Sequence, residues 1–401
     1  MKKVLVIGGG AYQAPLVKRI GELGHAAYCV DRDPAAPALK FAAGYRVLDA
    51  LDKQACLAYA RELGVSAVMT YGATITLPTV AYIGERLGLP ALPYETAELS
   101  KSKFLIKDRL AKAGLNTFGS YFEMSSKDEA RDHLFEFPCV VKPSDGSGSK
   151  GVSLVMNESE LPAALDYASD SARFGRFYCE RFIEGEEYSV EAFACRGEVY
   201  VYCIVKTTFT RSGENNEAIE YGHRTPSGLG SETEHLIAEE AKKAVLALGV
   251  TMGSVNFDVI LSKADAKPYI IDCGIRVGQN LLASHLVPLS RGVSVIDNTI
   301  RLALDEPVDA SPKKNDCVAT RLLIYDPGTI LEVRDHSELI GRDGILDVIL
   351  RKGIGEKQGV YKTKSDTCGW VICCGDTPDE AERRASIARK MLKDYIVIGE
   401  A

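Results

Sequence analysis

Residues 137–151, FPCVVKPSDGSGSKG, are the stretch from which the fold of this chain is inferred. The apolar run at 137–141 predicts a buried strand, and Lys142 stands where that strand ends. The loop that follows, at 144–151, is rich in glycine and exposes successive backbone N–H groups that can bind phosphate oxygens. It lacks the G-x4-G-K-[ST] spacing, so it is not a P-loop. A hairpin or a mobile turn is the alternative interpretation of this stretch alone.

The sequence before this stretch alternates short apolar runs with segments of helical spacing. Runs at 3–7, 26–30, 46–48 and 67–71 predict strands, and helices are expected at 14–23, 53–63 and 79–87. This alternation predicts a parallel sheet in a Rossmann-like domain. Glycines at 8–10 follow the first strand, but a dinucleotide fingerprint needs a further glycine where the sequence has Gln13. We therefore interpret the glycines as a tight strand-to-helix turn.

The remaining chain predicts mixed elements rather than strict alternation. One helix is expected at 95–113, a hairpin at 190–193 and 199–205, a polar loop at 207–231 and a helix at 232–248. Two strands at 254–261 and 269–273 and a helix at 293–304 follow. A polar stretch at 307–315 indicates a boundary, after which a small α+β unit ends in a helix at 379–394.

Charged side chains recur at the ends of these predicted strands. Glu180 and Glu187 flank a strand edge whose backbone can bind an adenine ring, with a carboxylate for the ribose hydroxyls. Asp258 and Asp272 follow apolar residues on two neighbouring strands, where they can bridge Mg²⁺, which prefers oxygen ligands. Turn capping is the alternative role of these aspartates, but it does not explain why both follow apolar strand residues. Lys103, taken alone, is an ordinary solvated helix lysine.

In their order along the chain, these elements resemble the ATP-grasp superfamily over residues 1 to about 305. The C-terminal unit fits the biotin-carboxylase-like and amino-acid ligase branch less specifically. The resemblance implies an α/β and α+β fold with a Rossmann-like pre-ATP domain at 1–94 and an ATP-grasp domain at 95–310, whose mobile lid lies at about 118–180. A small C-terminal α+β unit at 311–401 would complete the site. Ser102-Lys103 stands for the family's Asp-Lys pair, and Asp272-x-Gly274-x-Arg276 for its Glu-x-Asn-x-Arg pattern.

The resemblance also implies roles for particular residues. Nucleotide binding is expected of Lys103, Lys142, Ser147, Gly148, Ser149, Gly151, Glu180, Arg181, Phe182, Ile183 and Glu187. Asp258 and Asp272 are expected to hold Mg²⁺, as one or two ions and with Mn²⁺ as the alternative. Arg276, Arg321 and His223 are the expected catalytic residues. Gly274 replaces the asparagine that usually helps to hold the second metal, so a second ion is less expected than the first.

The function that this resemblance implies is a carboxylate–amine ligase that forms ADP and an acyl phosphate, acting on an amino acid or a similar small acid. Purine-pathway ligases of the formyl-transfer or carboxyaminoimidazole type fall within this class. A bicarbonate-activating carboxylase is the main alternative, but Asn280 stands where biotin carboxylases have a glutamate base, and no biotin-carrier segment appears. An ATP-binding protein without catalysis is a third interpretation. Glu220, His223 and Arg224 lie in the stretch that supplies substrate contacts in related ligases.

Composition limits the partners and the compartment. Among the 401 residues, 46% are hydrophobic and 26% charged, and the net charge of −7 argues against a nucleic-acid-binding surface. No apolar run approaches the roughly 20 residues of a membrane span. Eleven cysteines without zinc-like spacing predict a reduced, cytoplasmic protein. Closed twofold assemblies are the commonest kind, so a homodimer is compatible with the sequence, although no residue indicates one.

Overall fold

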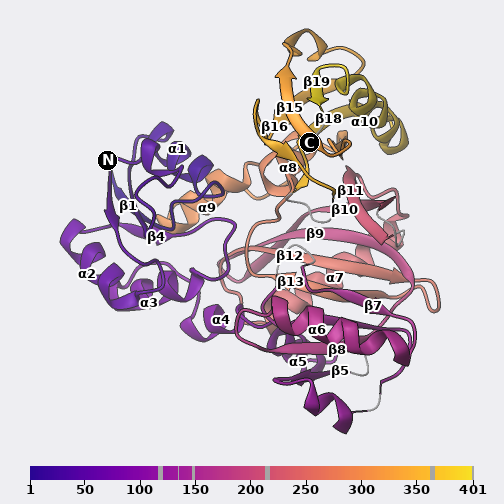
Figure 1. Cartoon of the computed structure of the whole chain (residues 1–401). Helices are drawn as coiled ribbons and strands as arrows, with labels where there is room; N and C mark the ends of the chain where they lie inside the picture. Colours follow the sequence, from indigo (N-terminus) through magenta and orange to yellow (C-terminus); the bar gives the residue numbers. More distant parts are fainter. Residues whose placement is uncertain (116–120, 134, 147–149, 213–216, 362–365, 400–401) are drawn as a thin grey trace.

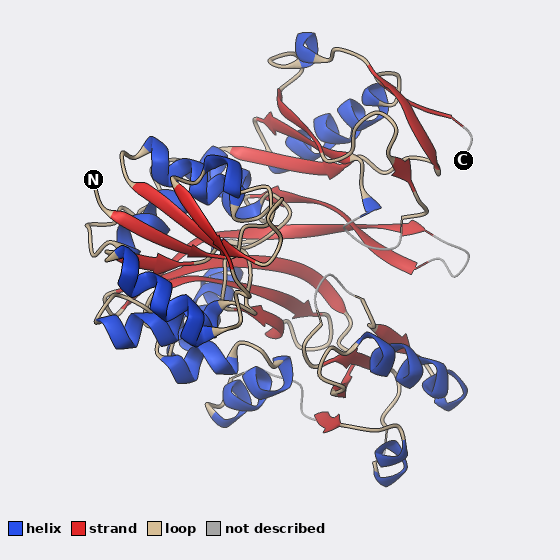
Figure 2. Ribbon diagram, turned by 60° about the vertical axis from the view of Figure 1, so that its left-hand side comes forward, coloured by secondary structure: helices blue, strands red, loops and turns tan. Residues whose placement is uncertain are grey.

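The computed structural model describes residues 1–115, 121–133, 135–146, 150–212, 217–361 and 366–399, which form four β-sheets with helices packed around them (Figure 1 and Figure 2). The mixture of parallel and antiparallel sheets confirms the predicted α/β and α+β fold class. Among the described residues, no helix is both long enough and apolar enough to cross a bilayer. Three of the expected nucleotide-binding residues, Ser147, Gly148 and Ser149, lie outside the described residues.

The N-terminal sheet has the order β3 (Gly44–Val47), β2 (Ala26–Asp31), β1 (Lys3–Ile7) and β4 (Ala67–Met69), all parallel. Strand β1, in the interior of this sheet, is apolar on both faces because helices cover both faces of the sheet. Helix α1 (Ala14–Glu22) packs against one face, and α2 (Lys53–Leu63) with α3 (Leu77–Leu87) against the other. At the end of β1 the amide of Gly9 donates to Asp31 Oδ2 at 2.7 Å, so this acid holds the glycine turn in place.

The single helix expected at 95–113 is in fact two, α4 (Tyr94–Leu99) and α5 (Lys103–Lys112). The break follows from Ser102, whose hydroxyl caps α5 by accepting the amide hydrogen of Leu105 at 3.2 Å. The new helix start matters for the site, because it places Lys103 at the first position of α5. The amide of Lys103 also donates to the carbonyl of Ser144 at 2.7 Å, which ties this helix to the glycine-rich loop.

A four-stranded antiparallel sheet holds that loop. Its order is β5 (Tyr121–Met124), β8 (Phe177–Arg181), β6 (Cys139–Pro143) and β7 (Ser153–Val155), with α6 (Leu161–Ser171) packed on one face. This sheet shares no strand with the other three sheets and forms its own small core. Its strands fall at about the residues predicted as the lid, so we call it the lid sheet.

The largest sheet, which we call the central sheet, is antiparallel and has eight strands. Their order is β13 (Pro268–Gly274), β12 (Gly253–Ser262), β9 (Gly185–Cys195), β10 (Glu198–Ser212), β11 (Glu217–Thr225), β14 (Cys317–Leu322), β18 (Gly369–Gly375) and β16 (Ile345–Leu350). Helix α7 (Ser231–Ala247) packs against it. The loop expected at 207–231 was wrong for residues 207–212 and 217–225, which belong to the hairpin of β10 and β11. These strands are polar, but β11 gains a distant partner in β14, which local composition does not show.

The C-terminal unit therefore continues the central sheet instead of standing apart from it. Strands β14, β18 and β16 extend that sheet, while β17 (Lys357–Gln358), β15 (Gly328–Val333) and β19 (Ile396–Gly399) form a second, small one. Helix α10 (Pro378–Leu392) covers their shared core. Helices α8 (Val287–Arg291) and α9 (Val295–Ala303) lead back to the Rossmann-like domain, where Arg19 of α1 pairs with Asp297 at 2.7 Å. The exact domain boundaries stay a prediction.

Candidate active site

A cluster of lysines and carboxylates forms where α5, the lid sheet and β13 meet. Lys103 of α5 is paired with Asp272 at the end of β13. Lys142, on β6, has its Nζ 2.7 Å from Glu180 Oε1 and donates to the carbonyl of Ile271 at 3.1 Å. Four segments that are far apart in the sequence thus bring together Lys103, Lys142, Glu180 and Asp272, which were all predicted site residues.

Lys107 belongs to the same cluster and was missed by the sequence analysis. Its side chain and that of Glu180 are both 3% exposed, and the two form an ion pair. Lys107 stands four residues after Lys103, on the same side of α5. Glu180 therefore lies between two lysines, Lys107 and Lys142. The only sequence signal was this four-residue spacing, which lysines on exposed helix faces share.

The charges of the cluster shift its pKa values in opposite directions. Burial alone would raise the pKa of Asp272, but the positive charges of Lys103 and Lys142 outweigh it and hold that pKa below its usual range. For Lys142, burial is again opposed, here mainly by Glu180, and the pKa is raised above its ordinary value. Burial dominates at Lys107 and lowers its pKa to about 7. The site is thus built to keep Lys142 positively charged and Asp272 negatively charged.

Asp258 and Asp272 suit a hard divalent cation. They are direct register partners across β12 and β13, so their side chains share one face of the sheet. Ser189 of β9 donates to Asp258 Oδ1 at 3.0 Å. In the described part of the chain, no group of three or more acidic, histidine or cysteine side chains could hold a metal ion. Two carboxylates fit Mg²⁺, which commonly takes one or two from the protein and fills its remaining positions with phosphates and water.

Arg276 occupies the space that Gly274 leaves open. A Cβ atom at Gly274 would lie 3.2 Å from Arg276 Cζ, tighter than an ordinary van der Waals contact. The Arg276 Nη1 atom donates to the carbonyl of Val277 at 2.8 Å. Glycine in place of the family asparagine therefore gives the arginine side chain room to fold over the end of β13.

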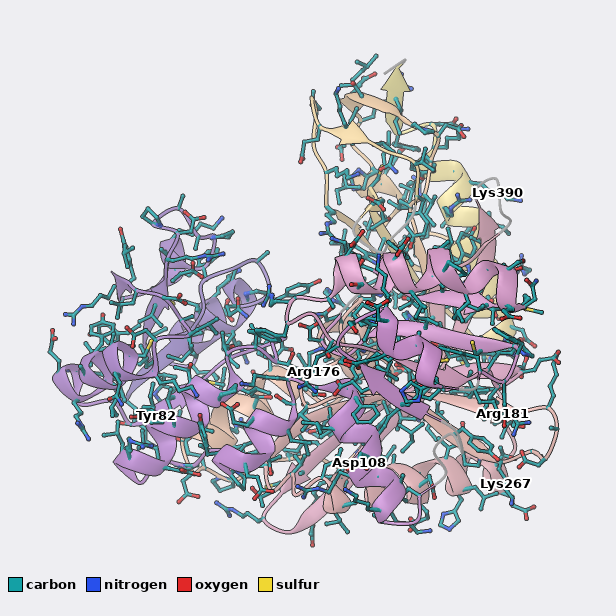
Figure 3. All side chains as sticks on the ribbon, turned by 60° about the horizontal axis from the view of Figure 1, so that its bottom comes forward. Tyr82, Asp108, Arg176, Arg181, Lys267 and Lys390 are labelled. Atoms are coloured by element: carbon teal, nitrogen blue, oxygen red, sulfur yellow. The ribbon has the colours of Figure 1, made fainter. Side chains whose placement is uncertain are left out.

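The remaining predicted nucleotide residues lie around the lid and the strand after it. Gly151 has a φ of +79°, and a Cβ atom there would meet the Ser171 Cβ at 2.5 Å, so the turn requires glycine. Arg181 is exposed at the outer edge of the molecule (Figure 3). The amide of Phe182 donates to the carbonyl of Pro138 at 3.2 Å. Ile183 and Glu187 are half-buried, Glu187 on β9 opposite Ile260. Their roles toward a nucleotide stay predictions.

A second polar group lies on β11. His223 Nε2 is 3.4 Å from Glu220 Oε1, and Asn280 donates to the same oxygen at 2.6 Å. Both Glu220 and His223 are buried. The hydroxyl of Tyr361 donates to the Glu220 carbonyl at 3.0 Å. The loop that carries Arg276 is thus connected through Asn280 to the two substrate-contact candidates.

Arg321 lies on the other face of the sheet from His223. His223 stands opposite Thr320 on β14, and successive strand residues point to opposite faces. The Arg321 guanidinium pairs with Glu382 and donates to Ser386 Oγ at 3.1 Å, both on α10. Arg321 is 3% exposed, and the catalytic role expected of it stays a prediction.

Arg224 shares this face. It also pairs with Glu382, at 3.1 Å. The two arginines therefore fasten α10 of the C-terminal unit to the central sheet.

Glu191 is a further buried carboxylate that the sequence analysis missed. It is 1% exposed and accepts the amide hydrogen of Gly278 with both oxygens, at 3.1 and 2.9 Å. Burial raises its pKa to about 8. A Cβ atom at Gly278 would lie 2.4 Å from Glu191 Oε2, so the loop after Arg276 can approach this acid only as glycine.

Comparison with known proteins agrees with this arrangement. Residues 100–278 match the family model described as ATP-grasp domain. These residues form an ATP-grasp domain. Residues 321–396 match a second model, L-amino acid ligase C-terminal domain 2. The ATP-grasp match contains Lys103, Lys142, Asp258, Asp272 and Arg276, and it confirms the resemblance inferred from their order.

Relatives and solved structures extend the similarity. This chain is 26% identical over 257 residues to a formate-dependent phosphoribosylglycinamide formyltransferase of Bacteroides thetaiotaomicron. That match spans 62% of this chain and 65% of the relative, just under two thirds of its length. An L-amino acid ligase from Bacillus licheniformis superposes with a TM-score of 0.83 at 23% identity, over 100% of this chain and 99% of that one.

A second similar structure holds a nucleotide. It is the biotin carboxylase domain dimer of the Hydrogenobacter thermophilus 2-oxoglutarate carboxylase, solved with MgADP, ADP and bicarbonate. Its TM-score is 0.75 at 19% identity, over 99% of this chain and 90% of that one. At these identities the two structural comparisons show that the fold is shared. ATP and Mg²⁺ are the ligands of the ATP-grasp family, and the cluster described above fits both.

Proposed function

We propose that this chain joins a small carboxylic acid, an amino acid or a similar acid, to an amine, with cleavage of ATP to ADP. A carboxylate oxygen of the acid attacks the γ-phosphorus, and ADP leaves. The amine nitrogen then attacks the carbonyl carbon of the acyl phosphate, phosphate leaves, and the nitrogen loses a proton. The observation that carries this proposal is the convergence of Lys103, Lys142 and Asp272 from α5, β6 and β13. The L-amino acid ligase C-terminal match supports it.

The residues of the cluster have different roles toward ATP. Lys103 and Lys142 neutralise phosphate charge, with Lys103 nearer the α-phosphate and Lys142 toward the transferring end. Asp258 and Asp272 would hold Mg²⁺, which would supply positive charge to the phosphates of ATP. Arg276 stabilises the transferring phosphate or holds the substrate carboxylate, since a guanidinium suits both. Catalysis of this kind rests on positioning and charge stabilisation.

The group on β11 supports an amino-acid substrate. Glu220 and His223 are buried side by side, 3.4 Å apart, and Asn280 joins them to the Arg276 loop. A carboxylate here suits the ammonium group of an amino acid, and His223 suits a base or a ligand for a carboxylate. The bicarbonate alternative is weaker, because Asn280 donates to Glu220 and cannot accept a proton as a base. The eleven free cysteines support the cytoplasm as the compartment.

The experiment that tests this proposal measures ADP and phosphate release from Mg-ATP with amino acids, singly and in pairs, with and without bicarbonate. Release that requires an acid and an amine together supports the ligase. Release on bicarbonate alone would replace it with the carboxylase. If no pair releases phosphate but calorimetry shows ATP binding, the non-catalytic interpretation gains. Asp272→Asn serves as the control that separates this activity from a contaminating ATPase.

A further inference from the structure

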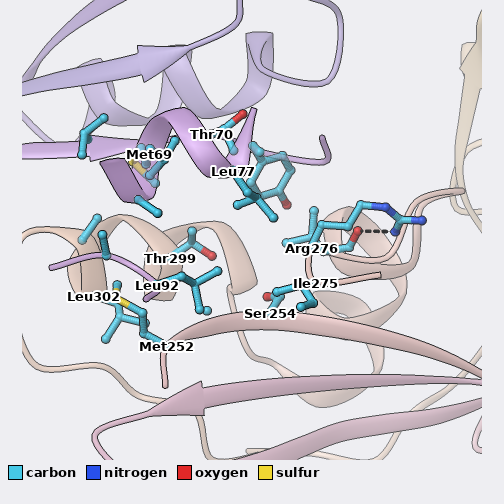
Figure 4. A pocket seen from close by; sticks show the side chains of 18 of the residues that line it. Met69, Thr70, Leu77, Leu92, Met252, Ser254, Ile275, Arg276, Thr299 and Leu302 are labelled. Carbon is cyan, nitrogen blue, oxygen red and sulfur yellow. Dashed lines mark hydrogen bonds between the residues drawn. The ribbon is translucent and has the colours of Figure 1, made fainter. Parts of the chain in front are cut away.

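A small cavity lies behind the loop that carries Arg276, between the Rossmann-like domain and the central sheet (Figure 4). Its volume is about 90 Å³. The wall comes from β4 and α3 with the residues after each, from the start of β12, from α9 and from residues 275–277. Most wall side chains are apolar, among them Val80, Leu92, Met252 and Leu302. The Arg276 guanidinium extends away from the cavity, so this space is distinct from the cluster at Asp272.

One polar side chain in the wall has no hydrogen-bond partner among the described residues. It is the hydroxyl-bearing side chain of Ser254, which is 7% exposed. The hydroxyls of Thr70 and Thr299 donate to the carbonyls of Ile7 and Val295 at 2.9 and 2.8 Å. A buried hydroxyl without a partner is unfavourable.

We propose that this cavity binds a small uncharged molecule, apolar except for one hydroxyl or amide group that hydrogen-bonds to Ser254. A 150 Å³ apolar cavity holds the six carbon atoms of benzene, so in proportion about four carbon atoms fit the space here, with the polar group against Ser254. Binding acts on the active site because Ile275, Arg276 and Val277 form part of the wall. The Arg276–Val277 hydrogen bond, drawn as a dashed line in Figure 4, connects that wall to the guanidinium. This proposal does not depend on the proposed function.

Methionine methyl groups give a local readout for the test. Of the six methionines, Met69 and Met252 line the cavity, while Met1, Met124, Met156 and Met391 lie outside its wall. In methyl NMR of the full chain titrated with 1-butanol, we expect saturable shifts of Met69 and Met252 alone. Ser254→Ala should weaken this binding about fivefold, the effect of one lost hydrogen bond. Butylammonium, equally long but charged, should cause no shift, because the apolar wall cannot pair its charge.

Three results would overturn the proposal or its parts. Shifts that grow linearly with 1-butanol at every methionine would mean a solvent effect and no site. Equal affinity in Ser254→Ala would remove the assigned hydrogen bond. Ala303→Leu, which fills the cavity from α9, should abolish binding, with thermal unfolding as its check on folding. Finally, saturating 1-butanol should change ADP affinity at least twofold in the wild type but not in Ala303→Leu, and an unchanged affinity would sink the coupling to Arg276.

Discussion

Replacing Lys107 by methionine tests whether this buried lysine holds Glu180, and through it Lys142, in place for the nucleotide. Methionine keeps the apolar stem and most of the length of lysine but removes the charge. Glu180, only 3% exposed, would then have Lys142 as its remaining lysine partner, 2.7 Å away. The variant therefore changes the charge balance of the cluster without changing a residue expected to contact the phosphates.

The expected loss of stability follows from the contacts. Removing one partner of a buried ion pair destabilises a protein by about 3–5 kcal/mol when the other charge is left unpaired. Here Lys142 still compensates Glu180, and burial of Lys107 already disfavours its own charge, lowering its pKa to about 7. Both effects reduce the loss, so we expect about 2 kcal/mol in the free energy of unfolding. Because Lys142 is then the lysine that pairs with Glu180, it is held more firmly by this carboxylate and is less available to the phosphates. ATP should therefore bind about tenfold more weakly.

Denaturant unfolding and calorimetry with Mg-ATP measure these two effects. Lys112→Met is the matched control, since Lys112 lies on the same helix, is 73% exposed and pairs with Asp108 at 2.6 Å. An exposed pair of this kind is worth at most about 1 kcal/mol, so the control should stay near the wild type in both assays. If Lys107→Met unfolds within about 0.5 kcal/mol of the wild type, or binds ATP equally well, Lys107 does not position Glu180.

Asp272→Asn should lower turnover about 10²-fold or more in steady-state assays while the protein stays folded, because it removes a charge-stabilising group from the transferring centre; near-normal turnover would contradict the metal assignment. Lys142→Ala should chiefly weaken nucleotide binding, and an unchanged ATP affinity by calorimetry would refute the role given to this lysine. Burial raises the pKa of Glu191 in the folded state to about 8 from an ordinary 4.5, so the folded protein retains a proton that the unfolded chain loses first. Stability should therefore fall as pH rises from 4.5 to 8, by up to about 1.4 kcal/mol per pH unit, and Glu191→Gln should flatten this slope in denaturant unfolding with a chelator present.

In the N-terminal sheet and the central sheet, the sequence predicted the strands well wherever they are continuously apolar. The run at 3–7 became β1, and the runs at 254–261 and 269–273 became β12 and β13. Local patterns failed where a tertiary partner decides the structure. The polar residues at 207–212 and 217–225 form strands because β14, far along the chain, pairs with β11. The helix expected at 95–113 breaks at Ser102, whose hydroxyl caps the second helix, α5.

By itself, the sequence determined the type and order of most elements and the set of charged residues that can act on ATP. These depend on local hydrophobic periodicity and on the ordered motifs that the ATP-grasp match confirms. Only the tertiary structure decided which equivalent side chains meet. Lys107 looks like any helix lysine until β8 sets Glu180 against it. Arg321 and His223 look equally suited to a site, but the two-residue period of paired strands turns them to opposite faces, because pairing across β11 and β14 leaves no freedom to rotate.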